Sequence, residues 1–277
     1  MAANEVQVEL WNARSGPTWV RFQEQLDRQL DPLGLAAMDA LAPRSGEAVL
    51  DIGCGCGQTS VELASRVGQT GRVLGVDVSE PMLALARERR AAPGSGEVEY
   101  LHADAQTTNL GARAFDTAFS RFGVMFFDEP VTAFANIRSA MKESARLAFL
   151  CWRSPAENPL LAGPIQAVAH LLPPMPLPDP EAPGPFAFAD PDRVRSILEL
   201  AGFGGVRVEP LDLPSGAQPF AAAIELAVSI GPLGLALREN PDRREAVMSV
   251  LPSFLEPYLK DGFVSVPTAT WIVTARA

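Results

Sequence analysis

The chain is predicted to fold as an α/β protein with a mostly parallel sheet. Short apolar segments alternate with amphipathic ones between residues 48 and 152. Strands that are apolar along their whole length are typical of a parallel sheet covered by helices on both faces. A glycine-rich turn follows the first strand, and each of the first three strands has an acidic residue close to its end. These three observations define the expected fold class.

The segment before the first strand is expected to be helical only in part. Residues 5–15 show no clear apolar period and are expected to be irregular. From residue 18 to residue 33, apolar side chains recur at steps of three and four, which predicts a helix. Pro32 and Gly34 are expected to interrupt it, with a second short helix reaching Leu41.

The next hundred residues predict five strands with helices between them. The expected strands are 48–53, 72–78, 97–103, 115–122 and 145–152. The expected helices are 57–67, 80–91 and 130–142. Ser79 is expected to cap the second of these helices, with Pro81 in its first turn. The segment KESA before the fifth strand is expected to be a turn.

The composition changes after Trp152. Seven prolines lie between Pro173 and Pro185. The elements expected in this part are helices at 159–172 and 191–201, a strand at 206–211, a mostly helical segment at 216–260 broken at Gly231, and a last strand at 268–277. Two insertions, about 153–190 and 213–263, would lie near the carboxyl ends of the strands, where open α/β sheets bind ligands. We expect them to form a lid.

The segment AVLDIGCGCGQTS, which begins with the first strand, carries the strongest functional signal. Gly53, Gly55 and Gly57 allow a sharp turn and a close approach to a ligand, and the following helix offers free N–H groups. A dinucleotide fingerprint needs glycine where this chain has Gln58. A carboxylate at Asp51 would repel a pyrophosphate but favours an ammonium or sulfonium group. The segment therefore favours S-adenosylmethionine (SAM), which has both cationic groups and no phosphate.

Two further acidic residues complete the pattern. Asp77 ends the second strand about 20 residues beyond the glycines, the spacing of the residue that binds ribose hydroxyls in nucleotide folds. Asp104 and Ala105 follow the third strand, where they are placed to meet an adenine edge. Three successive strands that end in carboxylates are more specific than the glycines alone.

With these residues the sequence resembles the class I SAM-dependent methyltransferases, especially the small-molecule branch similar to ubiquinone/menaquinone-biosynthesis C-methyltransferases. The resemblance is close over residues 49–152. It implies a Rossmann-like sheet of seven mostly parallel strands, in the order 3-2-1-4-5-7-6, with the last strand antiparallel and helical lid insertions. Residues 1–152 would form N-terminal helices plus the SAM-binding half, and residues 153–277 the lid insertions and closing strands of the same sheet.

The resemblance also implies which residues bind SAM. Asp51 and the three glycines would form the methionine-binding loop, and Asp77 would bind the ribose. The other implied contacts are with adenine (Val78, Met82), the adenine edge (Asp104, Ala105) and the methyl donor (Ser120, Phe122).

Four more residues are candidates for contact with the methyl acceptor, and each has an alternative role. Trp11 and Trp19 would line the cavity or would anchor a helix on the core. Arg121 would pair with an acidic substrate group or with the acidic residues 128–129. His170 would face the acceptor or solvent. No catalytic base is assigned.

Composition limits the possible functions. A net charge of −10 and a pI near 4.8 disfavour nucleic acid, because phosphate contacts need clustered Lys and Arg. The longest basic run, residues 87–90, is expected to be a solvated helix face. No stretch reaches the ~18 apolar residues of a membrane span and no signal-peptide pattern is seen, so a cytoplasmic location is expected. Cys54 and Cys56 are expected to fill the glycine turn, with no metal site.

Three functions stay open at this stage. The favoured one is transfer of a methyl group from SAM to O, C, N or S of a small, hydrophobic or aromatic acceptor. The second is a SAM-binding protein that does not transfer a methyl group. The third is an NAD(P)-dependent oxidoreductase, which Asp51 and Gln58 disfavour. Neither the acceptor nor the oligomeric state is predicted.

Overall fold

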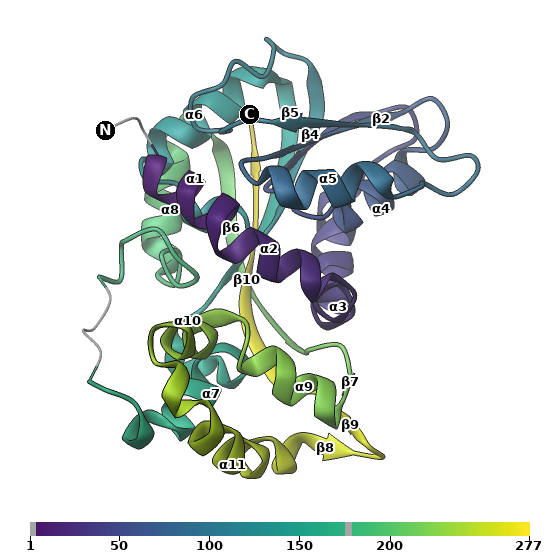
Figure 1. The fold of residues 1–277 in the computed structure, drawn as a ribbon. Helices are drawn as coiled ribbons and strands as arrows, with labels where there is room; N and C mark the ends of the chain where they lie inside the picture. Colours follow the sequence, from purple (N-terminus) through teal and green to yellow (C-terminus); the bar gives the residue numbers. More distant parts are fainter. Residues whose placement is uncertain (1–3, 175–178) are drawn as a thin grey trace.

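A seven-stranded sheet organises the computed structural model, which describes residues 4–174 and 179–277 (Figure 1). Its strands are β1 (Ala48–Ile52), β2 (Arg72–Asp77), β3 (Glu97–His102), β4 (Phe115–Arg121), β5 (Met141–Trp152), β6 (Gly204–Pro214) and β10 (Pro267–Arg276). They lie in the order β3-β2-β1-β4-β5-β10-β6. β10 is antiparallel to both of its neighbours, and the other pairs are parallel. The predicted fold class and strand order are confirmed, with β10 as the seventh strand.

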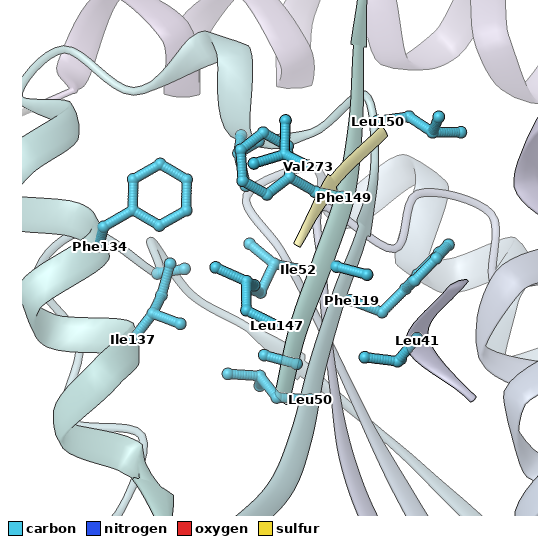
Figure 2. Packing of buried hydrophobic residues seen from close by; sticks show 14 of the residues in the cluster. Leu41, Leu50, Ile52, Phe119, Phe134, Ile137, Leu147, Phe149, Leu150 and Val273 are labelled. Atoms are coloured by element: carbon cyan, nitrogen blue, oxygen red, sulfur yellow. The ribbon is translucent and has the colours of Figure 1, made fainter. Parts of the chain in front are cut away.

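Helices cover both faces of this sheet. The connections contain α4 (Gln58–Val67), α5 (Glu80–Glu88), α6 (Pro130–Ala140) and α8 (Pro191–Leu200). β1 is buried along its whole length, as its continuous apolar sequence predicts. Figure 2 shows Phe134 and Ile137 of α6 on one side of the central strands and Leu41 with Phe119 on the other. The sheet is therefore fixed from both sides, which holds its carboxyl edge in place.

Three helices precede the sheet, where the sequence predicts an irregular segment and a broken helix. They are α1 (Glu5–Ala13), α2 (Ser15–Arg21) and α3 (Gln23–Leu41). The irregular assignment of residues 5–15 is wrong. None of the residues of α1 is fully buried. A helix that buries no residue needs no apolar stripe, so the sequence of α1 carries no helical period. Its position is instead set by distant contacts such as the hydrogen bond from Asn12 Nδ2 to Val78 O (2.7 Å).

The predicted interruption at Pro32 and Gly34 is also wrong, because α3 continues through both residues. An internal proline costs about 3 kcal/mol. The buried side chains of α3 offset this cost, since each large apolar side chain contributes about 1.5–3 kcal/mol when buried. The buried side chains on this helix include Leu26, Leu30, Leu33, Met38 and Leu41.

Two local details differ from the sequence prediction. β5 begins at Met141 and includes the KESA segment, which is not a separate turn. Ser144 in that segment has a φ of +61°, and the pairing of β4 with β5 shifts register between Phe115 and Thr117, so the extra residues form an irregularity within the strand. At α5, Ser79 makes no capping bond; its Oγ donates to Trp11 O, and Asn12 Oδ1 accepts the Glu80 N–H instead.

The second half of the chain adds a group of elements at one end of the molecule (Figure 1). They are α7 (Pro159–Ala167), α9 (Phe220–Ala227), α10 (Gly231–Glu239), α11 (Arg244–Leu255) and the short strands β7 (Gln218–Pro219), β8 (Leu259–Lys260) and β9 (Phe263–Val264). We call this group the lid. It has its own apolar cluster, which includes Val168, Leu233 and Leu251. The predicted helical break at Gly231 is confirmed. The strands β7, β8 and β9 were not predicted, because two residues are too few to show an alternating apolar pattern.

The remaining short elements are the single-turn 3-10 helices η1 (Val124–Phe126), η2 (Pro155–Glu157), η3 (Ala169–Leu171), η4 (Pro241–Arg243) and η5 (Glu256–Tyr258). Residues 175–178 of the proline-rich segment lie outside the described residues. Phe188, which follows that segment, returns to the main core and packs near Phe134 and Phe149. The insertion at 153–190 is therefore divided between the lid and the main core.

Buried polar side chains connect the lid to the sheet and to α3. Asn158 is fully buried; its Nδ2 donates to Ala269 O (2.9 Å) and its Oδ1 accepts from Ala269 N (2.9 Å). Gln218 Nε2 donates to Gln25 O (2.6 Å) on α3. These bonds hold the lid beside the end of β5 and the start of β10.

Among the described residues, no single helix is long and apolar enough to cross a membrane, although the bent pair α9 and α10 would meet the length and composition criteria together.

Candidate cofactor site

The glycine loop joins β1 to α4. Gly53, Gly55 and Gly57 have φ values of +66°, +56° and +81°, a region that favours glycine. A Cβ on Gly53 would lie 2.7 Å from Gly123 Cα, so this turn also requires close contact between two backbones. A Cβ on Gly55 would lie 2.8 Å from Met82 Cε, which places buried Met82 against the loop. The loop therefore has the backbone shape that its sequence predicts.

Asp51 lies beneath this loop and is 1% exposed. Thr59 Oγ1 (2.7 Å) and Ser60 Oγ (2.6 Å) both donate to its Oδ2. Its Oδ1 is buried and has no hydrogen-bond partner in the described chain. Burial raises the pKa of Asp51 to about 6, although the two hydroxyl groups act in the opposite direction. A nearby cation would stabilise the ionised form of this carboxyl group.

Asp77 stands at the end of β2 and supports the glycine loop directly. Its Oδ2 accepts from Gly55 N (2.8 Å), and its Oδ1 accepts from Ser79 N (2.8 Å). Burial raises the pKa of Asp77 above its usual value, and the backbone N–H groups oppose that effect. The adjacent Val78 uses its carbonyl to accept from Asn12 of α1. The structure thus brings Asp77, Val78 and the loop together.

Asp104 follows β3 at the same edge of the sheet. Its Oδ1 accepts from Gln106 N (2.9 Å) and from Asn4 Nδ2 (3.4 Å). Its Oδ2 is buried and has no partner among the residues described. An acceptor without a donor here matches the exocyclic amine of adenine. Ala105 is buried beside it.

Ser120 and Phe122 stand at the end of β4, next to the glycine loop. Ser120 Oγ donates to Ile52 O (2.8 Å) and accepts from Gly123 N (3.1 Å), so it links β4 to β1. Phe122 has a φ of +64°, which is a strained conformation for a bulky residue. Its ring stacks on Trp152, with the centroids 4.1 Å apart and the planes 2° from parallel. The two rings form an aromatic wall at the carboxyl ends of β4 and β5.

Arg121, between these two residues, faces α3. Its Nη1 donates to Gln58 Oε1 (2.6 Å), and its Nη2 lies 3.7 Å from Asp27 Oδ1. The alternative pairing with residues 128–129 is therefore wrong. Asp27 also pairs with Arg89, which donates to Cys56 O in the loop. The run 87–90 is consequently not one solvated face.

The two N-terminal tryptophans belong to one aromatic group. The Trp11 ring meets the edge of Trp19 at a centroid distance of 5.8 Å and that of Phe126 at 5.1 Å. Trp11 O accepts from Ser79 Oγ (2.8 Å), which ties α1 to the Asp77 turn. Both roles considered for the tryptophans are compatible with this position, because the group packs α1 and α2 over the strand ends.

The two histidines lie away from the loop. His170 is exposed on η3 in the lid, and the structure does not bring it to the glycine loop. His102 ends β3, where its Nε2 lies 2.9 Å from Val78 O. In the described part of the chain, no group of three His, Cys, Asp or Glu side chains is arranged to hold a metal ion.

Sequence reasoning missed the polar residues of α1 and α3 that close over the site. Asn4 lies in a segment without an apolar period, where no sequence signal selects it. Asp27 and Asp31 are spaced four residues apart on α3, and Gln58 Nε2 donates to Asp31 Oδ1 (2.8 Å). That spacing places both on one helix face, and it is a signal that the sequence does contain.

The residues present fit SAM. Two buried carboxylate oxygens, Asp51 Oδ1 and Asp104 Oδ2, have no partner in the described chain, so both are available to accept from donors such as an ammonium and an adenine amine. The glycine loop leaves no room for Cβ atoms and so presents bare backbone. An NAD(P) pyrophosphate would lie against the Asp51 carboxylate, which would repel it. Gln58 stands where a dinucleotide fingerprint needs glycine, and its side chain is bonded to Asp31 and Arg121.

The fold and the arrangement of the site are similar to those of class I methyltransferases, and known proteins show the same likeness. Residues 49–144 match the family described as a methyltransferase domain.

Curated relatives carry methyltransferase names. Aklanonic acid methyltransferase of Streptomyces sp. (strain C5) is 34% identical over 118 residues, which cover 43% of this chain and 54% of the relative. A ubiquinone/menaquinone biosynthesis C-methyltransferase of Escherichia fergusonii is 31% identical, covering 49% of this chain and 55% of the relative. The match thus spans about half the length of these two. Nocamycin O-methyltransferase of Saccharothrix syringae is 27% identical, covering 88% of this chain and 90% of the relative.

Solved structures confirm the fold over most of the chain. A putative methyltransferase from Bacillus halodurans has a TM-score of 0.54 at 17% identity, covering 88% of this chain and 97% of its own. A structure named the [4+2]-cyclase SpnF has a TM-score of 0.55 at 21% identity, covering 89% of this chain and 80% of its own. At these identities the likeness concerns the fold alone.

Proposed function

We propose that this protein is a SAM-dependent methyltransferase that acts on a small, hydrophobic or aromatic acceptor at O, C, N or S. The observation that carries the proposal is the set of three carboxylates around the glycine loop, two of which keep a buried oxygen without a donor. The methyltransferase names of the relatives and the family match over residues 49–144 support it.

Each carboxylate has a proposed role. Asp51 would receive the ammonium of the methionyl group, Asp77 the ribose hydroxyls and Asp104 the adenine amine. Val78, Met82 and Ala105 would enclose the adenine. Asp77 also fixes the loop through Gly55 N, so ribose binding and loop shape depend on one side chain.

When bound, SAM supplies a methyl group activated by a sulfonium, and displacement at that carbon forms the bond to the acceptor while the bond to sulfur breaks. The protein's task is alignment and exclusion of water. Ser120 holds β4 against β1, which keeps the aromatic wall in register with the loop. The stacked rings of Phe122 and Trp152 would form an apolar side of the acceptor pocket.

The lid contains a small apolar cavity, and none of the residues that line it belongs to the glycine loop. A cavity of about 60 Å³ lies between α7, α9, α11 and the start of β10, with mostly aliphatic walls that include Leu161, Ala223 and Val266. Gln29 of α3 also lines it. We propose that residues 153–277 supply the lid and closing strands while residues 1–152 hold SAM. A cytoplasmic location and a small-molecule partner without nucleic acid are proposed with this function.

A second function is a SAM-binding protein that does not transfer a methyl group. The neighbour named as a [4+2]-cyclase favours keeping it, because the same fold occurs there under a different reaction name. The donor site would look identical in both cases. Transfer of label therefore has to decide between them.

The test is incubation with methyl-labelled SAM and panels of phenols, quinones, amines and thiols. Gly55→Val should abolish binding of S-adenosylhomocysteine (SAH) and labelling together. Gly94→Val is the matched control, because Gly94 also has a positive φ (+87°) but no atom of residues 4–174 or 179–277 lies within 4 Å of its Cβ position. Binding of SAH without label in any acceptor would favour the second function. Retained binding in Gly55→Val would contradict the location of the site.

A further inference from the structure

The cavity in the lid, which we call the lid cavity, combines aliphatic walls with buried polar side chains. Its volume is about 60 Å³. Most of the side chains that line it are aliphatic, among them Leu160, Leu226 and Val264. Ser215 and Gln218 line it as well, and they are only 4% and 1% exposed. One short segment of the chain therefore places two buried polar side chains in a wall that is otherwise mostly apolar.

The amide group of Gln218 is hydrogen-bonded through its nitrogen only. Nε2 donates to Gln25 O on α3 (2.6 Å), and this bond fixes the orientation of the amide, because a backbone carbonyl can only accept. Oε1 is buried and has no hydrogen-bond partner within residues 4–174 and 179–277. A buried carbonyl oxygen that accepts no hydrogen bond carries a desolvation cost. A ligand with a donor group in the lid cavity would remove that cost.

Ser215 provides a group of the opposite kind. Its Oγ accepts from Val266 N (3.0 Å), and in the described chain this hydroxyl group donates to no acceptor. A hydroxyl group on a ligand can both donate and accept, so it can pair with Gln218 Oε1 and with the Ser215 hydroxyl group. An ether oxygen can only accept, so it can pair with Ser215 alone. An aliphatic alcohol therefore matches both the polar side chains and the apolar wall.

The volume of the lid cavity limits the size of this ligand. A buried water molecule needs about 10–15 Å³ and about two to four polar partners, so the cavity has room for roughly four to six such volumes. Water at Ser215 and Gln218 would satisfy these two side chains, but the aliphatic remainder of the space offers further water molecules too few partners. A ligand with one hydroxyl group and roughly four aliphatic carbons fits both parts.

α3 separates the lid cavity from the glycine loop. The backbone carbonyls of Gln25 and Gln29 accept hydrogen bonds from residues 216–218, and Gln29 also lines the cavity. Asp31 lies two residues beyond Gln29, which is about 200° around the helix. Its carboxylate accepts from Gln58 Nε2 (2.8 Å) at the start of α4. A ligand in the lid cavity would thus lie on the other side of α3 from the donor site.

We propose that the lid cavity is a second binding site, separate from the donor site, that takes a short aliphatic alcohol. Gln218 Oε1 accepts the hydroxyl proton of the ligand, and Ser215 Oγ donates to its oxygen. The aliphatic carbons contact Leu160, Leu226 and Val264. This site goes beyond the proposed function and does not depend on SAM.

The experiment is an NMR titration of the full chain with butan-1-ol and with its isomer diethyl ether. The two probes have the same molecular formula, but the ether has no proton to donate. The methyl resonances of Leu160 and Val264 report binding. Ala223→Leu fills the cavity, because Ala223 lines it. Ala221→Leu, on the exposed side of the same helix, is the matched control.

The wild type should bind butan-1-ol with a dissociation constant on the order of millimolar. Diethyl ether should bind at least about tenfold more weakly, because it leaves Gln218 Oε1 without a donor. Gln218→Met should reduce this preference to less than about threefold. Ala223→Leu should abolish binding of both probes, and Ala221→Leu should leave it unchanged. The comparison of the two probes in the wild type does not depend on the folding of any variant.

Three results would overturn the proposal. Equal affinity of the wild type for both probes would show that the polar side chains take no part in binding. No binding of butan-1-ol would leave the cavity to water. Loss of butan-1-ol binding when SAH is present at saturation would show that the two sites are not separate. Failure of SAH to bind would contradict the proposed function alone, because Gly55→Val should still bind butan-1-ol.

Discussion

Replacing Asp51 by asparagine should remove the part of the free energy of unfolding that the wild type loses as the pH rises. The pKa of Asp51 rises from 3.8 to about 6 in the folded protein because the carboxyl group is buried. A raised pKa means that the folded state holds its proton more tightly than the unfolded chain. The stabilisation is fully present below pH 3.8 and is lost as the pH rises through about 6. A pKa raised from 3.8 to about 6 corresponds to about 3 kcal/mol.

The assay is urea unfolding of wild type and Asp51→Asn, without cofactor, at intervals from about pH 4 to about pH 7.5. Between the lowest and the highest pH, the free energy of unfolding of the variant should rise relative to that of the wild type by up to about 3 kcal/mol. Asparagine does not titrate, and the contributions of all other groups cancel in the difference between the two proteins. The same linkage predicts that SAM binds the wild type more tightly above pH 6, and that the variant binds weakly at every pH. A stability difference that is independent of pH would refute the assignment of Asp51 as a buried, titrating group.

Three further predictions concern the rest of the structure. Asp104→Asn should weaken SAH by about 1–3 kcal/mol through loss of the adenine acceptor, and unchanged affinity in calorimetry would contradict this. Trp152→Ala should cost about 3–5 kcal/mol of unfolding free energy, because it removes a buried stacked ring, and a loss under about 1 kcal/mol would argue against tight packing. Gly163→Val should destabilise the lid by about 1–3 kcal/mol, since its Cβ would overlap the Phe254 ring. Gly204→Val should not, because Gly204 has open space around its Cβ position among the described residues. Limited proteolysis compares the two variants, and equal rates of cleavage would contradict the packing of Gly163 against Phe254.

The features that could be predicted from sequence are those encoded by neighbouring residues. β1 is apolar over its whole length, and the glycine spacing fixes the turn that follows it. The three carboxylates could be placed at one edge because parallel strands end on the same side. By contrast, α1 depends on Asn12 reaching across to Val78, and α3 passes through Pro32 because its buried side chains outweigh the local penalty. Such effects depend on tertiary contacts.

The site shows the same division. The types of residue near the donor were predictable, but their hydrogen bonds were not. Ser120 could be placed beside the loop, yet its hydroxyl group is engaged by Ile52 O. Arg121 could be selected, but its partner Asp27 comes from a helix far away in the chain. The stacking of Phe122 on Trp152 needs the register of two strands and a left-handed residue, neither of which has a local sequence signal.

The most direct test of the central claim is titration of the wild-type protein with SAM, SAH and NAD. The carboxylates at Asp51, Asp77 and Asp104 predict that SAM and SAH bind with dissociation constants on the order of micromolar, and that NAD does not bind. Binding of NAD, or no binding of SAM and SAH, would contradict the assignment of this site to a methyl donor.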